Sequence, residues 1–223
     1  MTFSLVARCA KTGQFGMVIS SSSPAVAARC AHTRAGVGVV ASQNITDPGL
    51  GPLLLDELAT GKTASDALQS ITNGRQYIDY RQLLLVDAKG NTAIHSGRQV
   101  LGIWGEAQGK DCAAGGNLLA NHNIPQAMIT AFETATGHLG DRLIAALQAG
   151  LRAGGEAGPV HSAGMKIADK LDWPLVDLRI DWSDNPITDL AAAWQVYRPQ
   201  MAAYVQRAID PTQAPSYGVP GDE

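Results

Sequence analysis

Apolar and polar residues alternate at the start of the chain, which predicts strands with two different faces. The first strand is expected over residues 3–8, with apolar Phe3, Leu5 and Ala7 on one face and Ser4, Val6 and Arg8 on the other. Turn glycines follow at Gly13 and Gly16, and the run MVIS predicts the return strand. Further strands are expected in AGVGVVASQ, in the hairpin LLLVD–AKGN–NTAIHSG, as short strands within QVLGIWGEAQGKDCAAGGNLLAN, and in AGMKIADK and PLVDLRIDW.

Helical spacing of apolar residues separates these groups of strands. A short helix is expected over residues 52–59, and Thr63 with Asp66 predicts the N-cap of a second helix over Ala64–Thr72. Residues 124–152 carry two more helices with apolar side chains three and four positions apart. A closing helix is expected over residues 186–209, bent or broken at Pro199.

The order of these elements indicates the fold class. Strands occur in hairpins and helices occur in pairs, without the strand–helix–strand alternation of a parallel sheet. We therefore expect an α+β protein with antiparallel sheets covered by pairs of helices. We also expect a single domain over residues 1–210 and a proline- and glycine-rich tail over residues 211–223.

Composition narrows the possible functions. The chain has 223 residues, 45% of them hydrophobic, and a net charge of −3 without any basic run, so no nucleic-acid partner is expected. No apolar stretch reaches the ~18 residues that span a bilayer, and the start lacks the pattern of a signal peptide. Together with three scattered cysteines, Cys9, Cys30 and Cys112, these features predict a cytoplasmic protein without membrane association.

Several familiar motifs are present only in part. GVGVVA fits the dinucleotide-binding pattern, but it is itself a valine-rich strand and does not open a helix. GKT resembles the end of a phosphate-binding loop but lacks the first glycine, and Thr63 is better explained as a helix cap. The five histidines have no zinc-ligand spacing. We therefore expect neither a cofactor nor a metal.

Thr2 lies directly behind Met1, at the head of the first predicted strand. Removal of an initiator methionine is usual before a small residue, and Thr2 would then carry both a hydroxyl nucleophile and a free α-amine. Such an amine has a reference pKa of ~7.7–8.0 and can accept the hydroxyl proton at neutral pH. The oxyanion that develops on the attacked carbonyl needs hydrogen-bond donors directed at it. This arrangement is typical of an N-terminal threonine that hydrolyses amide bonds through an acyl-enzyme.

The blocks MTFSLVA, TRAGVGVVASQNITDPGLGP, RQLLLVDAKGN, GGNLLA and VDLRID, in this order, resemble a bacterial family of unknown function in the Ntn-hydrolase-like superfamily. The resemblance runs from Met1 to about Pro186, which is most of the chain. It implies a four-layer αββα sandwich, with two antiparallel sheets face to face and helices outside. It also implies kinship in fold with proteasome subunits and with N-terminal-nucleophile amidohydrolases.

The resemblance further implies a set of site residues. The nucleophile falls on Thr2, and Ser22 stands where proteasome-like members place an acidic helper, which argues against proteasome-like proteolysis. Gln43, beside Asn44, and Asn117 are the amides expected in the cleft, and Arg34 is the candidate cation that lowers the pKa of the amine. Each also has a purely structural interpretation: Asn44 and Asp47 would cap the next turn, Asn117 would bind backbone, and Arg34 would be exposed.

Two functions from different classes remain open. The first is hydrolysis of an amide bond in a small or peptide-like substrate through Thr2. The alternative is a non-catalytic protein that keeps the fold and binds a small ligand, or serves as a scaffold. In either case we expect a homodimer that pairs through the alanine-rich helices at residues 143–152 and 190–208.

Overall fold

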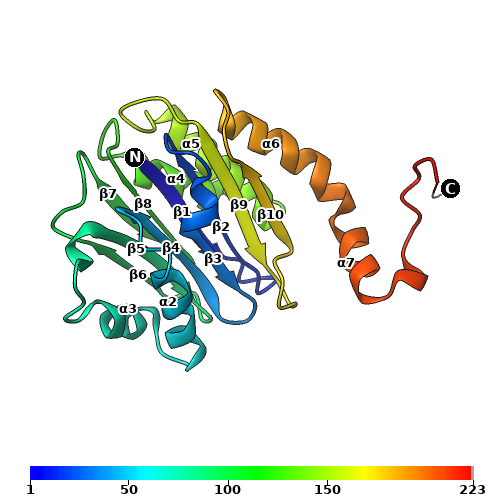
Figure 1. The fold of residues 1–223 in the computed structure, drawn as a ribbon, viewed down its shortest axis with the longest axis horizontal. Coiled ribbons are helices and arrows are strands. Elements are labelled where there is room, and N and C mark those ends of the chain that lie inside the picture. The colour runs from blue at the N-terminus through cyan, green and yellow to red at the C-terminus, as the bar shows by residue number, and fades with distance from the viewer. Residues whose placement is uncertain (222–223) are drawn as a thin grey trace.

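The computed structural model describes residues 1–221, which fold into four stacked layers (Figure 1). Among these residues, one sheet has six strands in the order β10-β9-β2-β1-β8-β7, and the other has four in the order β3-β4-β5-β6. All neighbouring strands in both sheets run antiparallel. The prediction of an α+β fold with two antiparallel sheets flanked by helices is confirmed. Residues 222–223 of the predicted tail lie outside the described residues.

The strand boundaries follow the predicted alternation closely. The six-stranded sheet is built from β1 (Thr2–Arg8), β2 (Phe15–Ser21), β7 (Gly105–Gly109), β8 (Cys112–Asn117), β9 (Ser162–Ala168) and β10 (Val176–Ile180). The four-stranded sheet is built from β3 (Ala31–Arg34), β4 (Gly38–Asn44), β5 (Arg81–Asp87) and β6 (Thr92–Ser96). Strand β3 was not among the predicted strands, because this short edge strand shows little apolar alternation.

The helices also agree with the predicted pattern. They are α1 (Val26–Cys30), α2 (Leu50–Ala59), α3 (Ala64–Thr72), α4 (Ile124–Thr134), α5 (Leu139–Arg152), α6 (Pro186–Tyr197) and α7 (Met201–Ile209). The predicted cap of α3 is present, since the Thr63 hydroxyl accepts a hydrogen bond from the Asp66 backbone N–H at 3.2 Å. The predicted break at Pro199 is present as a 3-10 turn, Arg198–Gln200, between α6 and α7.

Because side chains alternate between the two faces of a strand, the buried apolar residues divide into three clusters. The outer face of the six-stranded sheet, including Phe3 and Leu5, packs against α4, α5 and α6. The inner faces of the two sheets meet through residues such as Val6 and Leu84, and the outer face of the other sheet packs against α2 and α3. Each large apolar side chain buried in this way contributes about 1.5–3 kcal/mol to folding. The strand faces therefore determine the order of the four layers.

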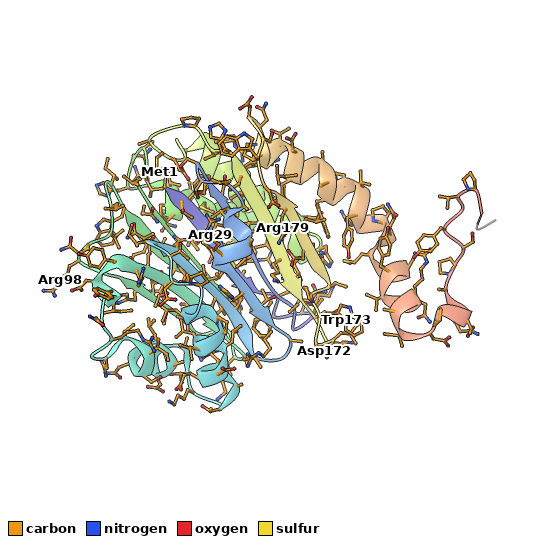
Figure 2. The ribbon with its side chains drawn as sticks, in the orientation of Figure 1. Met1, Arg29, Arg98, Asp172, Trp173 and Arg179 are labelled. Carbon is orange, nitrogen blue, oxygen red and sulfur yellow. The ribbon has the colours of Figure 1, made fainter. Side chains whose placement is uncertain are left out.

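The register of β1 places its first residue at one rim of the sandwich. Thr2 pairs with Asn117 on β8, and Phe3 pairs with Ser20 on β2. Phe3 faces the helices, so by alternation Thr2 and Ser4 face the gap between the two sheets. Figure 2 shows Met1 at this end of the molecule, whereas Trp173 lies at the opposite end.

Helix α7 and the segment that follows it extend away from the body of the molecule (Figure 1). Every residue of α7 keeps some solvent exposure, and Val196 on α6 and Ile209 on α7 are 66% and 59% exposed. In α5, by contrast, Leu143 and Leu147 are buried in the core. The apolar surface available for pairing therefore lies mainly on α6 and α7, and the homodimer stays a prediction. Across residues 1–221, none of the helices has both the length and the apolar character needed to traverse a lipid bilayer.

Candidate functional site

The hydroxyl of Thr2 lies between the preceding carbonyl group and a serine of the neighbouring strand. Thr2 is only 5% exposed. Its Oγ1 donates a hydrogen bond to the carbonyl oxygen of Met1 and lies 3.5 Å from the Oγ of Ser21. The Ser21 hydroxyl donates to the same carbonyl oxygen of Met1. Two hydroxyl groups are thus directed at one carbonyl oxygen beside Thr2.

Ser21 is held in this position by the serine-rich end of β2. Its Oγ lies 2.9 Å from the Oγ of Ser23 and accepts a hydrogen bond from the Ser23 backbone N–H at 3.1 Å. The segment after β2 is also held by β9, since the Ser162 hydroxyl donates to the Ser23 carbonyl at 2.6 Å. Ser21 is the last residue of β2 and lies on the inner face of the sheet, so its side chain faces Thr2. Ser22, the serine that was predicted as a site residue, follows the end of the strand.

A buried carboxylate lies against the residue that was predicted at the acidic position. Glu156 is 5% exposed, and its two carboxylate oxygens accept hydrogen bonds from the Ser22 backbone N–H at 3.2 and 3.1 Å. Burial raises the pKa of Glu156 to about 7, against the lowering effects of the N-terminal amine and of Ser22. The chain therefore has an acid at the end of β2, supplied from the loop that follows α5.

Glu156 and Ser21 were not among the predicted site residues. Ser21 is part of the run SSSP, and its inward direction follows from its spacing to the inner-face residues Met17 and Ile19. Glu156 is a lone acid in the segment AGGEAGPV, which has no periodic pattern. Its position depends on a tight bend in which Gly154 and Gly155 have φ values of +128° and +60°.

A layer of polar side chains crosses the space between the sheets next to Thr2. The Ser4 hydroxyl donates to Gln43 Oε1 at 2.7 Å, and Gln43 Nε2 donates to Gln82 Oε1 at 2.9 Å. Asn117 Nδ2 donates to the same Gln82 oxygen at 3.3 Å. These four side chains are at most 1% exposed and come from β1, β4, β5 and β8. We refer to Ser4, Gln43, Gln82 and Asn117 as the polar layer.

The polar layer brings two of the predicted residues close to Thr2. Asn117 is the strand partner of Thr2, and Gln43 binds Ser4, the next residue of β1 on the same face. Gln43 Nε2 already donates to Gln82 and, at 3.3 Å, to the Gly115 carbonyl. Gln43 is therefore positioned to hold the two sheets in register beside Thr2.

The structure does not bring Arg34 to Thr2. Arg34 pairs with Gly38 at one end of β4 and forms an ion pair with Asp56 at 2.8 Å, whereas Gln43 lies near the other end of that strand. The rise of a strand, about 3.3 Å per residue, puts the two ends of β4 roughly 20 Å apart. Arg34 is thus part of a half-exposed ion pair at the far end of the sheet.

Two neighbouring polar residues follow the structural interpretation given above. Asn44 Nδ2 donates to the Tyr80 carbonyl at 2.7 Å, and its Oδ1 accepts from the Leu101 N–H at 3.2 Å. Asp47 Oδ1 accepts from the Gly49 N–H at 3.0 Å and so shapes the turn before α2. Within residues 1–221, no group of three or more His, Cys, Asp or Glu side chains is arranged to hold a metal ion.

The raised pKa of Glu156 predicts a specific dependence of stability on pH. Its folded-state value of about 7 exceeds the ordinary value of 4.5, so the folded protein binds this proton more tightly than the unfolded chain. The stabilisation is therefore complete below pH 4.5 and is lost as the pH rises through about 7. Glu156→Gln, which keeps an acceptor for the Ser22 N–H, is expected to remove this loss.

Urea unfolding of both proteins across this pH window measures the effect. The wild-type free energy of unfolding should fall relative to that of Glu156→Gln between about pH 5 and about pH 8. Parallel pH profiles for the two proteins would contradict the assignment of a raised pKa to this carboxyl group.

Comparison with known proteins identifies the family of this chain. Residues 2–190 match the model of a family described as a family of unknown function, DUF1028. The crystal structure of protein SPO2555 from Silicibacter pomeroyi, assigned to the same family model, is similar with 30% sequence identity and a TM-score of 0.86. That match covers 92% of this chain and 90% of the other. The predicted resemblance to a family of unknown function is confirmed.

More distant likenesses are also found among solved structures. HslV from Trypanosoma brucei has 10% identity and a TM-score of 0.46, over 76% of this chain and 99% of that one. Anbu (ancestral beta-subunit) from Yersinia bercovieri has 12% identity and a TM-score of 0.39, over 91% and 97%. At these values neither likeness informs on chemistry. No match is found among curated proteins.

Proposed function

The chain belongs to the DUF1028 family of unknown function. We propose that it hydrolyses the amide bond of a small or peptide-like substrate through Thr2. The observation that supports the proposal most strongly is the environment of the Thr2 hydroxyl. It lies at the head of a central strand with a carbonyl oxygen and the Ser21 hydroxyl beside it. Removal of Met1 would leave the hydroxyl next to a free α-amine.

The proposed reaction uses the groups around Thr2 in two steps. The α-amine takes the proton from Oγ1, and Oγ1 attacks the carbonyl carbon of the substrate. The Ser21 hydroxyl, which donates to the Met1 carbonyl in this structure, donates instead to the substrate oxyanion. The C–N bond then breaks, and the proton passes to the leaving amine. Water next hydrolyses the ester on Thr2, returning a proton to Oγ1 and releasing a carboxylic acid.

Other residues act by positioning the nucleophile. The polar layer links β1 and β8 of one sheet to β4 and β5 of the other sheet, next to Thr2. These hydrogen bonds give the Thr2 hydroxyl a rigid support. Glu156, bound to the Ser22 N–H, brings an acid close enough to the N-terminus for the amine to lower its pKa.

The alternative function, binding of a small ligand without catalysis, rests on a different observation. While Met1 is present, the nitrogen of Thr2 is part of an amide and cannot accept a proton. The Met1 carbonyl also occupies both hydroxyl groups of the site. A protein that keeps Met1 in the cell would retain the fold and have no amine to act as a base.

Comparing the full chain in two forms tests the proposal. One form begins at Met1 and is produced with methionine removal inhibited, and the other begins at Thr2 after cleavage of a fusion protein, with both verified by intact mass. We expect the form that begins at Thr2 to hydrolyse members of a panel of chromogenic amides. The form that begins at Met1 should show no activity, because its threonine nitrogen is an amide.

Two further results have clear meanings. Intact mass of the protein from its native host should correspond to the chain without Met1. Equal hydrolysis by both forms would contradict the role of the α-amine, and a native protein that retains Met1 and hydrolyses no amide of the panel would favour the binding function.

A further inference from the structure

The loop between β6 and β7 connects the two sheets at the end of the sandwich that carries Thr2. Strand β6 ends at Ser96, which pairs with Gln82 of the polar layer. Strand β7 begins beside the end of β8 that pairs with Thr2. Residues 97–104 therefore cross from one sheet to the other at the end of the gap where Thr2 lies.

Large apolar side chains on this loop and on two neighbouring loops remain exposed to solvent. They are Ile45, Tyr80, Leu101, Ile103 and Trp104, each between 39% and 46% exposed. We refer to these five residues as the apolar rim. Apolar side chains that gather on a protein surface commonly mark a site that contacts another molecule.

Hydrogen bonds hold the backbone of the apolar rim in one arrangement. The Asn44 side chain connects two of its segments, since Nδ2 donates to the Tyr80 carbonyl at 2.7 Å and Oδ1 accepts from the Leu101 N–H at 3.2 Å. The Ile45 N–H donates to the same Tyr80 carbonyl at 3.3 Å. The apolar rim is thus formed before a ligand arrives, which lowers the entropic cost of binding.

The apolar rim is joined directly to the strand that pairs with Thr2. Leu118, the residue after the end of β8, donates its N–H to the Leu101 carbonyl at 2.9 Å, and Leu119 donates to the Ile103 carbonyl at 2.8 Å. Because the Cα atoms of paired residues are about 5.5 Å apart or closer, the Leu101 carbonyl oxygen lies at most about 11 Å from the Cα of Thr2. One large side chain on a bound molecule and one on the rim together span this distance.

The charged side chains of these loops are already engaged. Arg98 forms an ion pair with Asp79 at 2.7 Å, and the guanidinium group of Arg81 donates to the Ile45 carbonyl. An apolar group is therefore a better match to the rim than a charged group, which would have to compete with these pairings.

We propose that the apolar rim binds a large apolar side chain of the substrate, next to the amide bond that Thr2 attacks. The inference rests on the proposed function and names its substrate class as amides, including short peptides, with an aromatic or large aliphatic group beside the scissile bond. The occupant is the substrate and not a second copy of the chain, because the rim lies within reach of Thr2. The apolar surface available for pairing lies on α6 and α7.

Binding to a chain that cannot form the acyl-enzyme tests the rim separately from catalysis. The full chain that begins at residue 2 and carries Thr2→Ala is titrated calorimetrically with N-acetyl-L-phenylalaninamide and with N-acetylglycinamide. Both compounds are uncharged and have the same two amide groups, so they differ only in the benzyl group. We expect the phenylalanine compound to bind at least about tenfold more tightly, as burial of one aromatic side chain implies.

Trp104→Ser, added to the same chain, is expected to reduce this preference at least several-fold. Trp173→Ser is the matched control, because Trp173 is 42% exposed and Trp104 is 39% exposed. Figure 2 shows Trp173 and Arg98, which belongs to the β6–β7 loop, on opposite sides of the sandwich. The control should keep the full preference, and thermal melting checks that both variants are folded. Equal affinity for the two compounds, binding of neither, or the same loss in both variants would overturn the inference.

Light scattering examines a second copy of the chain as the occupant. We expect the chain that begins at residue 2 and its Trp104→Ser variant to have the same molecular mass in solution. A mass that falls on this substitution would assign the apolar rim to a subunit interface and overturn the inference.

The outcomes also separate this inference from the proposed function. A preference for the phenylalanine compound that depends on Trp104, in a protein whose wild-type form hydrolyses no amide, would support the apolar rim and contradict catalysis. Hydrolysis of 4-nitroanilides of N-acetylphenylalanine and N-acetylglycine with equal kcat/KM would support catalysis and overturn the role of the rim.

Discussion

Thr2→Ala in the chain that begins at residue 2 is expected to lower the rate of amide hydrolysis by at least about 10³-fold. Loss of the group that forms the covalent bond removes the acyl-enzyme route, and nucleophile deletions in hydrolases cost factors up to about 10⁶. The measurement is the single-turnover rate on the best amide of the chromogenic panel. Alanine and threonine are both small enough at position 2 to permit removal of Met1. The wild-type protein and the variant can therefore be prepared in the same way.

Thr2→Ser is the matched control for this prediction. It keeps a hydroxyl and an α-amine on the same residue, and we expect activity within about tenfold of wild type. Both variants should unfold at nearly the same urea concentration as wild type, because in the chain that begins at residue 2 the bond from the Thr2 hydroxyl to Met1 is absent and its contact with Ser21 is long, at 3.5 Å. Wild-type activity in Thr2→Ala would assign the chemistry to another residue.

Ser21 provides an internal check on the proposed mechanism. Its hydroxyl is 3.5 Å from Thr2 Oγ1 and is directed at the same carbonyl oxygen. If Ser21 were the nucleophile, Thr2→Ala would retain activity. The freed α-amine belongs to Thr2 itself, so the mechanism assigns the attack to the Thr2 hydroxyl and assigns the Ser21 hydroxyl to the oxyanion.

The layers of the fold could be predicted because burial of strand faces follows directly from the order of the residues. Phe3 and Leu5 share one face of β1, and that face packs against helices. Local chemistry was equally informative, since the cap formed by Thr63 and Asp66 begins α3 at the predicted residue. Pro199 interrupts the last helix because it has no N–H to donate.

The candidate site could be predicted only where it depends on position along a strand. Thr2 and Asn117 come together because β1 and β8 are neighbours in register. Arg34 lies elsewhere because β3 runs away from the end of β4 that carries Gln43, and the sequence does not contain the direction of a short edge strand. Glu156 belongs to a loop whose path is fixed by its contact with Ser22, a tertiary feature without a local signal.

The polar layer shows a further limit of sequence patterns. Gln82 precedes the apolar run LLLV, and its amide looks like the solvated end of a strand. In the folded protein it is fully buried, and its amide binds four partners: Gln43, Asn117, Ser96 and the Gly116 carbonyl. A buried amide of this kind is compatible with folding only when its partners are present, and these come from three other strands.

Gln82→Leu is therefore expected to lower the free energy of unfolding by about 3 kcal/mol. Leucine has a similar volume but offers no acceptor to Asn117 Nδ2 and removes the shorter of the two bonds made by Gln43 Nε2. A buried donor left without its acceptor costs about 1–3 kcal/mol. Urea unfolding at neutral pH measures the loss, and an unchanged slope with urea concentration shows that both proteins unfold from comparable folded states.

Gln14→Leu is the matched control, because Gln14 is also a buried glutamine and lies directly before β2. Its amide makes one long hydrogen bond, 3.4 Å from Nε2 to Asp169, and its Oε1 has no partner among the described residues. We expect this substitution to change stability by less than about 1 kcal/mol, because few hydrogen bonds are lost. Equal losses for the two variants would mean that removal of any buried amide, and not the connection between the sheets, accounts for the effect of Gln82.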